Sequence, residues 1–196
     1  GVTASRRRIV NIMKRRGMAG AYARRTSEPH KTRADEAGLA NLPDRGFDGY
    51  APHTRPAGDL AYVRVGGDWA YVCPLAGLAD RGIVGHSAGR TRDASLVLGA
   101  FATLDFPPAD VQVFHTDRGG EFDNTRIDEP LDVFGIKRSL PCKGNPYDNA
   151  VVESTNRLLK KELVYRNHYT TIEQLRHDLN DYVWWSDNQR LHSTLG

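Results

Sequence analysis

FHTDRGGEF (residues 114–122) and NPYDNAVVESTNRLLKKEL (residues 145–163) are the two stretches that decide how this chain is interpreted. Thirty-five residues separate Asp117 in the first stretch from Glu153 in the second. A third acid, Asp59, opens the apolar run DLAYVRV. The three carboxylates therefore fall on segments that read as a strand end, a helix and a strand.

This layout suits a site that transfers phosphoryl groups with two metal ions. Mg²⁺ prefers oxygen ligands in near-octahedral geometry, usually carboxylates, water and substrate phosphate. Two such ions, roughly 3.5–4 Å apart, can activate an attacking hydroxyl and stabilise the leaving oxygen. The spacing alone is weak evidence, because 24 Asp and Glu residues produce many coincidental spacings and most acids are solvated.

The hydrophobic pattern around these acids alternates between strands and helices. Two apolar runs joined by Gly66-Gly67-Asp68 predict a β-hairpin, with strands at 59–65 and 69–75. The other predicted elements are strands at 82–88, 111–115 and 136–140 and helices at 93–104, after Asn124, at 148–166 and at 172–187. Strands followed by alternating helices and strands indicate an α/β layer fold.

Five stretches resemble the catalytic core of the DDE transposases of bacterial insertion sequences, specifically the IS3-type transposases, which are relatives of retroviral integrases. The matching stretches are GDLAYVRVGGDWAYV, GIVGHSAG, FHTDRGGEFDN, GIKRSLPCKGNPYDNAVVESTNRLLKKEL and WWSDNQRLHSTLG, and they cover roughly residues 40 to 196. The resemblance implies a ribonuclease H-like α/β fold, with a mixed five-stranded sheet flanked by helices. It also implies a location in the bacterial cytoplasm, associated with the nucleoid when bound to DNA.

The resemblance implies a role for each matching residue. Asp59, Asp117 and Glu153 would be the catalytic metal ligands, holding two Mg²⁺ or Mn²⁺ ions in the active complex. Lys160 would be the helical lysine near the scissile DNA. The partners would be double-stranded DNA, both transposon ends and target, and further copies of the chain in a synaptic complex. Cleavage and strand transfer would proceed in line at phosphorus, without a covalent enzyme intermediate.

The predicted helix at 148–166 places an acid and bases on one face. Glu153, Arg157 and Lys160 stand at i, i+4 and i+7, and Lys161 follows directly. A carboxylate followed by bases could hold a metal ion and grip the adjoining phosphates. By itself the triplet favours a surface ion pair over a DNA-binding role, and the family resemblance reverses that preference.

The positive charge is concentrated at the N-terminus. Residues 1 to 34 carry ten Lys or Arg and one acid, Glu28, which leaves the remainder with 17 bases and 23 acids, a net charge of −6. Arg6, Arg7 and Arg8 open a predicted amphipathic helix at 5–16 and are candidate phosphate contacts. We therefore expect a basic arm and linker at 1–57, the remnant of an upstream DNA-binding region, and an integrase-type core at 58–196. The alternative to a DNA-binding arm is that this basic segment is a solvated and partly disordered tail.

Composition excludes several classes of protein. No apolar run approaches the roughly 18 residues of a membrane span, and the basic N-terminus lacks the apolar segment of a signal peptide. Two cysteines, Cys73 and Cys142, are too few for a Cys-only zinc site. We expect no membrane partner.

Three departures from the family pattern leave alternatives open. Pro74 falls inside the second predicted strand, so that strand should be an edge or should stop there. Gly77 stands where the family commonly has Asp, and Pro130 should interrupt the helix after Asn124. The alternatives are a truncated or decayed transposase that only binds DNA or a partner, and another ribonuclease H-like nuclease.

Overall fold

The computed structural model describes residues 5–18, 51–79, 81–117, 119–140 and 150–190. The chain separates into two compact units, Gly1–Arg33 and Ala34–Gly196. The division predicted at residues 57 and 58 stays a prediction, and most of the predicted linker lies outside the described residues.

Helix α1 (Arg6–Arg15) belongs to the first unit and confirms the predicted amphipathic helix. The Ser5 hydroxyl accepts a hydrogen bond from the backbone N–H of Arg8 and caps the N-terminus. Gly17 takes the left-handed conformation, with φ +63°, directly after the last turn. Lys14 and Arg15 lie in that last turn, where positive charge suits the helix dipole.

The second unit is built on one mixed sheet. Its strands are β1 (Pro56–Gly58), β2 (Ala61–Val65), β3 (Asp68–Gly77), β4 (Ile83–Gly89), β5 (Val113–Thr116) and β6 (Lys137–Ser139). Strand β3 lies between β4 on one side and β1 and β2 on the other, and all three are antiparallel to it. Strand β5 lies parallel to β1 and to β6. The predicted hairpin is strands β2 and β3, and both glycines of its turn have positive φ, as a two-residue turn requires.

Strands β1 and β2 are two parts of one strand. Gly58 pairs with Leu75 and Ala61 pairs with Val72, so one register continues across the gap at residues 59 and 60. The six segments therefore form the five-stranded mixed sheet that was expected.

The expectation that Pro74 marks an edge or a strand end is wrong. Strand β3 runs through Pro74 to Gly77 and is an internal strand. His86, which pairs with Pro74, directs its N–H away from β3 to the Thr103 hydroxyl, so the backbone of Pro74 points toward the other neighbour. The continued register places Asp59 there. Pro74 has no N–H, and it faces the gap between β1 and β2. The proline therefore removes no hydrogen bond between the strands.

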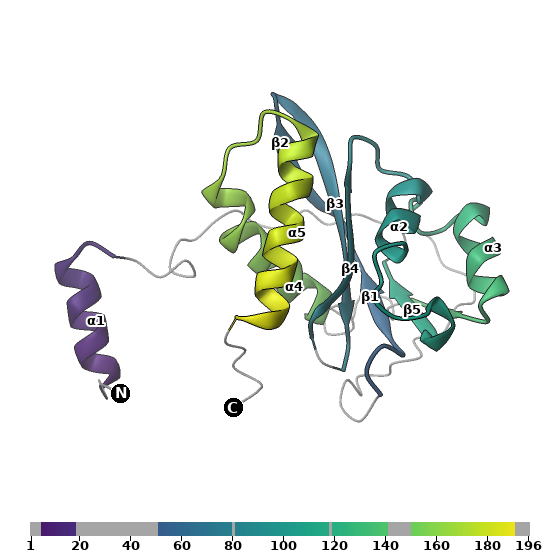
Figure 1. The fold of residues 1–196 in the computed structure, drawn as a ribbon, viewed down its shortest axis with the longest axis horizontal. Coiled ribbons are helices and arrows are strands. Elements are labelled where there is room, and N and C mark those ends of the chain that lie inside the picture. Colours follow the sequence, from purple (N-terminus) through teal and green to yellow (C-terminus); the bar gives the residue numbers. More distant parts are fainter. Residues whose placement is uncertain (1–4, 19–50, 80, 118, 141–149, 191–196) are drawn as a thin grey trace. The chain divides into compact units, whose positions relative to one another are not determined.

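Two helical layers cover the sheet (Figure 1). The helices are α2 (Ala94–Phe101), α3 (Thr125–Val133), α4 (Ala150–Glu162) and α5 (Ile172–Asn188), with single 3-10 turns η2 (Pro108–Asp110) and η3 (Val164–Arg166). Helices α4 and α5 pack on β2, β3 and β4 through residues such as Leu159 and Leu179. Helices α2 and α3 pack on the opposite face, around Phe114 and Phe122. Full burial of side chains of this size stabilises the fold by about 1.5–3 kcal/mol each.

The expectation that Pro130 interrupts a helix is also wrong. Helix α3 continues from Thr125 to Val133 with Pro130 inside it. Pro130 lacks the N–H that would bond the carbonyl of Arg126, but the next turn forms normally, since Phe134 N–H bonds the Pro130 carbonyl at 3.1 Å. Ile127 and Leu131 are buried on either side of the proline, and this packing holds the helix in place.

None of the helices in the described part of the chain is both long enough and apolar enough to cross a membrane.

Candidate active site

The parallel pairing of β1 and β5 brings two of the three predicted acids together. Ala57 pairs with His115 and Gly58 with Thr116, and the residues that follow these pairs are Asp59 and Asp117. Asp59 and Asp117 therefore lie side by side on adjacent strand lines. The two strands are direct neighbours in the sheet.

Asp59 is fixed by two short hydrogen bonds. Its Oδ1 accepts the backbone N–H of Leu60 at 2.7 Å, and its Oδ2 accepts Nδ2 of Asn156 at 2.7 Å. Asn156 comes from helix α4 and is 6% exposed. Its Oδ1 is buried, and no partner for it is found among the described residues. The bond ties the strand line that carries Asp59 to the helix that carries Glu153.

The electrostatics of Asp59 and Asp117 are those of two crowded carboxylates. Burial, together with repulsion from the neighbouring Asp117 carboxylate, raises the pKa of Asp59 to about 6, against the opposing effects of Leu60, Asn156 and Lys160. Burial also raises the pKa of Asp117, while the Gly119 N–H and the Arg92 charge oppose this rise. A cation between the two carboxylates would relieve both burial and repulsion, so these oxygen donors fit a hard divalent ion.

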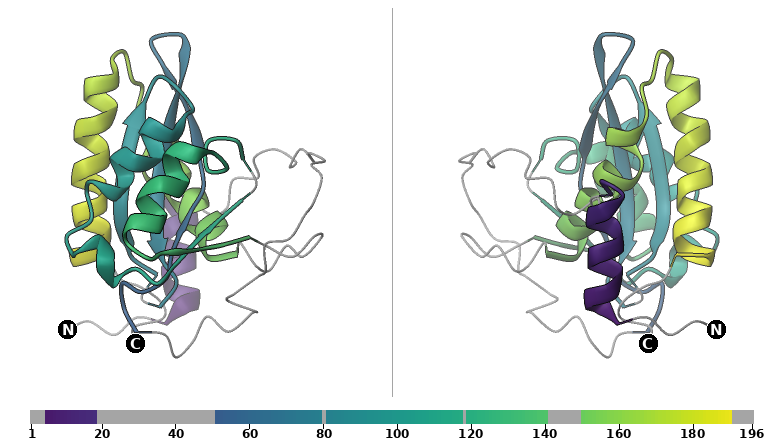
Figure 2. Two further views of the ribbon diagram at one scale, coloured as in Figure 1. Left: turned by 90° about the vertical axis from the view of Figure 1, so that its right-hand side faces the viewer. Right: turned by 90° about the vertical axis from the view of Figure 1, so that its left-hand side faces the viewer.

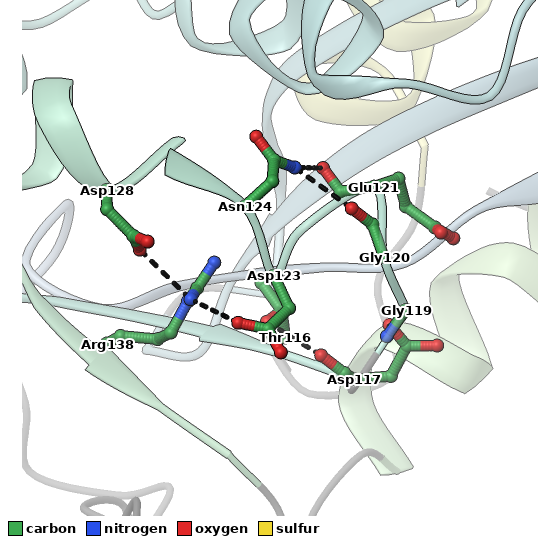
Figure 3. Close-up of polar contacts among 9 residues, drawn as sticks. All are labelled: Thr116, Asp117, Gly119, Gly120, Glu121, Asp123, Asn124, Asp128 and Arg138. Carbon is green, nitrogen blue, oxygen red and sulfur yellow. Dashed lines mark hydrogen bonds and ion pairs between the residues drawn. The ribbon is translucent and has the colours of Figure 1, made fainter. Parts of the chain in front are cut away.

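The loop after Asp117 is closed by its own polar contacts (Figure 3). Asp117 Oδ1 accepts the Gly119 N–H at 3.0 Å. The Asn124 side chain donates to the carbonyls of Gly120 and Glu121 at 2.9 and 3.0 Å. A Cβ at Gly119 would approach the Glu121 carboxyl group to 2.6 Å, so a side chain there would displace the acid. The loop therefore holds Asp117 in one orientation.

Arg138 braces the same loop from strand β6. Its Nη1 lies 3.0 Å from carboxylate oxygens of both Asp123 and Asp128, as Figure 3 shows. The guanidinium is largely buried, whereas both acids are substantially exposed. Asp123 thus has a structural contact.

Glu121 is buried beside the site at 8% exposure. Its Oε2 lies 3.6 Å from Nε of Arg92, and Arg92 also donates to the Tyr62 hydroxyl at 2.7 Å. Sequence reasoning missed Arg92 and Asn156. The signal for Asn156 was its position three residues after Glu153, on a neighbouring part of the helix surface.

His115 has a packing role in the structure. It is fully buried, and its Nδ1 lies 3.0 Å from the Ser139 hydroxyl.

Helix α4 carries Glu153 but does not bring it into a cluster with the Asp pair. Val152 packs against Ala57 and Ala76 and anchors the helix to the sheet, whereas Glu153 is exposed. Among the described residues, no three acid, histidine or cysteine side chains lie close enough together to hold a metal ion. The structure thus brings together Asp59 and Asp117 but does not bring Glu153 into the same cluster.

The predicted DNA-binding residues fall on two separate elements. Lys160 is half-buried on α4, and its charge lowers the pKa of Asp59, which places it near the Asp pair. Arg157 is exposed and donates to the Ser154 hydroxyl at 3.4 Å, and Lys161 is half-buried on the same helix. Arg6, Arg7 and Arg8 lie on α1, in the first unit, with the last two exposed.

Comparison with known proteins agrees with this architecture. A family model described as an integrase core domain matches residues 135–196. The chain is 32% identical over 212 residues to a protein named as a candidate transposase for insertion sequence element IS986/IS6110 of Mycobacterium tuberculosis (strain CDC 1551 / Oshkosh). The match covers 100% of this chain and 73% of that protein. A second relative is the transposase for insertion sequence element IS904 of Lactococcus lactis subsp. lactis (strain IL1403), 27% identical, with 100% of this chain and 78% of the relative covered.

The fold has a solved counterpart. The catalytic core domain of HTLV-2 integrase, solved in complex with magnesium in a trimeric form, superposes with a TM-score of 0.56 at 19% identity. The superposition covers 76% of this chain and 94% of that domain. The ribonuclease H-like α/β fold expected from the sequence is confirmed.

Proposed function

We propose that this chain, which belongs to the family of insertion-sequence transposases, cuts and joins DNA strands with Asp59, Asp117 and Glu153 as its catalytic carboxylates. One observation carries the proposal, namely the register of β1 and β5 that places Asp59 beside Asp117. The family has a DDE-type catalytic core, and two of the three acids already share one corner of this sheet.

The carboxylates would hold Mg²⁺ or Mn²⁺, two ions in the active complex. The magnesium bound to the HTLV-2 integrase core supports this choice of ion. When bound, the ions supply activation of the attacking hydroxyl and neutralisation of the leaving oxygen. Glu153 would join the Asp pair from helix α4.

The chain's own residues hold the carboxylates in position and neutralise charge on the DNA phosphate. Asn156 holds the Asp59 carboxylate in one orientation, and the Gly119 N–H does the same for Asp117. Lys160 supplies a positive charge near the site for the phosphate adjoining the scissile bond. No side chain has to act as a nucleophile, since water and a DNA 3′-hydroxyl can attack phosphorus directly.

The remaining assignments rest on the family and on charge. Double-stranded DNA, as transposon ends and target, is the proposed substrate, and Arg6, Arg7, Arg8, Arg157 and Lys161 are proposed phosphate contacts. The basic arm at 1–57 and the core at 58–196 are proposed as separate functional regions. We further propose assembly of several copies around paired DNA ends, in the bacterial cytoplasm and on the nucleoid.

A second candidate function is DNA binding without catalysis. The observation that favours it is the exposed position of Glu153, outside any cluster able to hold an ion among the described residues. This candidate predicts salt-sensitive DNA binding and no metal-dependent products.

Cleavage and joining of labelled element ends with Mg²⁺ or Mn²⁺ tests the first candidate against the second. Glu153→Gln should abolish products, whereas Glu129→Gln, at an exposed acid of helix α3, should leave them unchanged. Equal products from Glu153→Gln and the parent would remove Glu153 from the proposal. DNA binding by the parent without any products would establish the second candidate, and equal cleavage of DNA lacking element ends would indicate a general nuclease.

A further inference from the structure

An aromatic and basic patch lies on the β2–β3 hairpin, outside the site described above. Side chains alternate along β2, so that Ala61, Val63 and Val65 are buried while Tyr62 and Arg64 are exposed. The patch, called here the hairpin patch, consists of Tyr62, Arg64, Trp69, Tyr71 and Arg92. Tyr62 is 43% exposed and Trp69 is 47% exposed, which is unusual for rings of this size.

The rings of the hairpin patch are ordered by cross-strand contacts. Tyr62 pairs with Tyr71 and Arg64 pairs with Trp69 across the two strands. Tyr62 meets Tyr71 and Trp69 edge-on, with ring centroids 5.2 and 6.1 Å apart. The guanidinium carbon of Arg64 lies 4.0 Å from the Trp69 ring centroid. The cluster is therefore organised before any partner arrives, at little further cost in conformational entropy.

Cross-strand pairing explains these contacts, but it leaves the outer surfaces of the rings in water. Helices α2 and α3 cover the rest of this sheet face, whereas the hairpin extends beyond them (Figure 2). An exposed aromatic surface of this kind marks an interaction site more often than a solvent-facing one. Arg64 and Arg92 give it positive charge, which points to an anionic partner.

Arg92 connects the hairpin patch to the catalytic carboxylates. It donates to the Tyr62 hydroxyl, lies 3.6 Å from Glu121, and its charge lowers the pKa of Asp117. Tyr62 follows Asp59 by three residues on the same strand line, a distance of about 10 Å. Because side chains alternate along a strand, Tyr62 projects from the sheet face opposite to Asp59. Strand β2 ends the strand order, so a DNA strand held at Asp59 and Asp117 would pass over this edge of the sheet to reach the rings.

We infer that the hairpin patch binds unpaired DNA bases next to the scissile phosphate, stacking them on Trp69 and Tyr62 and pairing their phosphates with the two arginines. This inference rests on the proposed function and adds the form of DNA that the site prefers. Bases in an intact duplex stack on one another, and only their edges can be reached in the grooves. Unpaired bases expose their faces, and stacking on aromatic side chains accepts any base sequence.

Binding of two labelled DNAs, a duplex with a single-stranded overhang and the matching blunt duplex, tests the inference by fluorescence anisotropy in EDTA. Trp69→Ala should weaken binding of the overhang DNA about five- to tenfold and change binding of the blunt duplex less than about twofold. Trp69→Phe should retain most of the affinity because it keeps a ring. The matched control is Trp184→Ala, since Trp184 is a 58% exposed tryptophan on helix α5.

A second measurement leaves the hairpin patch intact. The chain has three tryptophans, so replacing Trp184 and Trp185 by Phe leaves Trp69 as the single tryptophan. Overhang DNA should quench the fluorescence of Trp69 to saturation, and blunt duplex should not. Absence of quenching, or equal losses of affinity from Trp69→Ala and Trp184→Ala, overturns the inference.

The metal-dependent cleavage assay with Glu153→Gln separates this inference from the function on which it rests. Cleavage that depends on Glu153, together with unchanged overhang binding by Trp69→Ala, refutes the hairpin patch and leaves the catalytic proposal standing. Overhang binding that depends on Trp69 in a chain that makes no products supports the patch and refutes catalysis.

Discussion

Asp59→Asn should stabilise the metal-free protein at neutral pH. Burial and, second to it, repulsion from Asp117 raise the pKa of Asp59 from 3.8 to about 6. A difference of one unit between the folded-state and unfolded-state pKa corresponds to about 1.4 kcal/mol. Ionising Asp59 therefore costs about 3 kcal/mol more in the folded state than in the unfolded state. The side chain keeps some contact with water, and we expect a gain of about 1–3 kcal/mol for the neutral Asn.

The pH dependence of this gain has a definite sign. Because the folded-state pKa is raised, the parent loses stability as the pH rises from about 4 to about 6, and the loss is complete above that range. Asn at this position does not ionise. The difference between the variant and the parent should therefore be near zero at pH 4 and full at pH 7.5.

Thermal unfolding followed by circular dichroism in EDTA measures the difference. For a chain of this size, 1 kcal/mol of stability corresponds to about 2–4 °C in Tm, so Tm should rise by about 2–12 °C at pH 7.5. Asp110→Asn, at an exposed acid in the 3-10 turn η2, is the control and should leave Tm unchanged. An Asp59→Asn variant with the same Tm as the parent at pH 7.5, or with an equally large rise in Tm at pH 4, refutes the account of two crowded carboxylates.

Three further changes test the fold and the site. Pro130→Ala should stabilise the protein by about 1–3 kcal/mol in urea unfolding, because it restores a helical hydrogen bond in α3; a loss of stability would contradict this. Phe114→Ala should cost about 3–5 kcal/mol in the same assay, since Phe114 is 0% exposed and contacts the Phe122 ring. Asn156→Ala should slow strand cleavage about tenfold and move the acidic limb of its pH–rate profile to higher pH, because a hydrogen bond that lowers the pKa of Asp59 is lost. An unshifted profile would refute the role of Asn156 in positioning Asp59.

Helix and strand positions followed closely from local patterns. The hairpin turn at Gly66 and Gly67 and the helix from Ile172 were expected at nearly their observed bounds, because turn chemistry and apolar periodicity act over a few neighbouring residues. The two prolines gave wrong expectations for the same reason. The free-energy cost of Pro74 depends on which neighbouring strand its backbone faces. The free-energy cost of Pro130 depends on packing by residues of other helices and strands.

The sequence by itself determined the family, the alternation of strands and helices, and which acids deserve attention, since each of these is written in residue types and spacings along the chain. Only the tertiary structure decided that Asp59 and Asp117 meet, that Asn156 holds one of them, and that Glu153 lies outside their cluster. It also decided that the Tyr62 and Trp69 rings are exposed beyond helices α2 and α3. Contacts between residues distant in sequence depend on strand register and on the closeness of helix packing, and no local pattern encodes either.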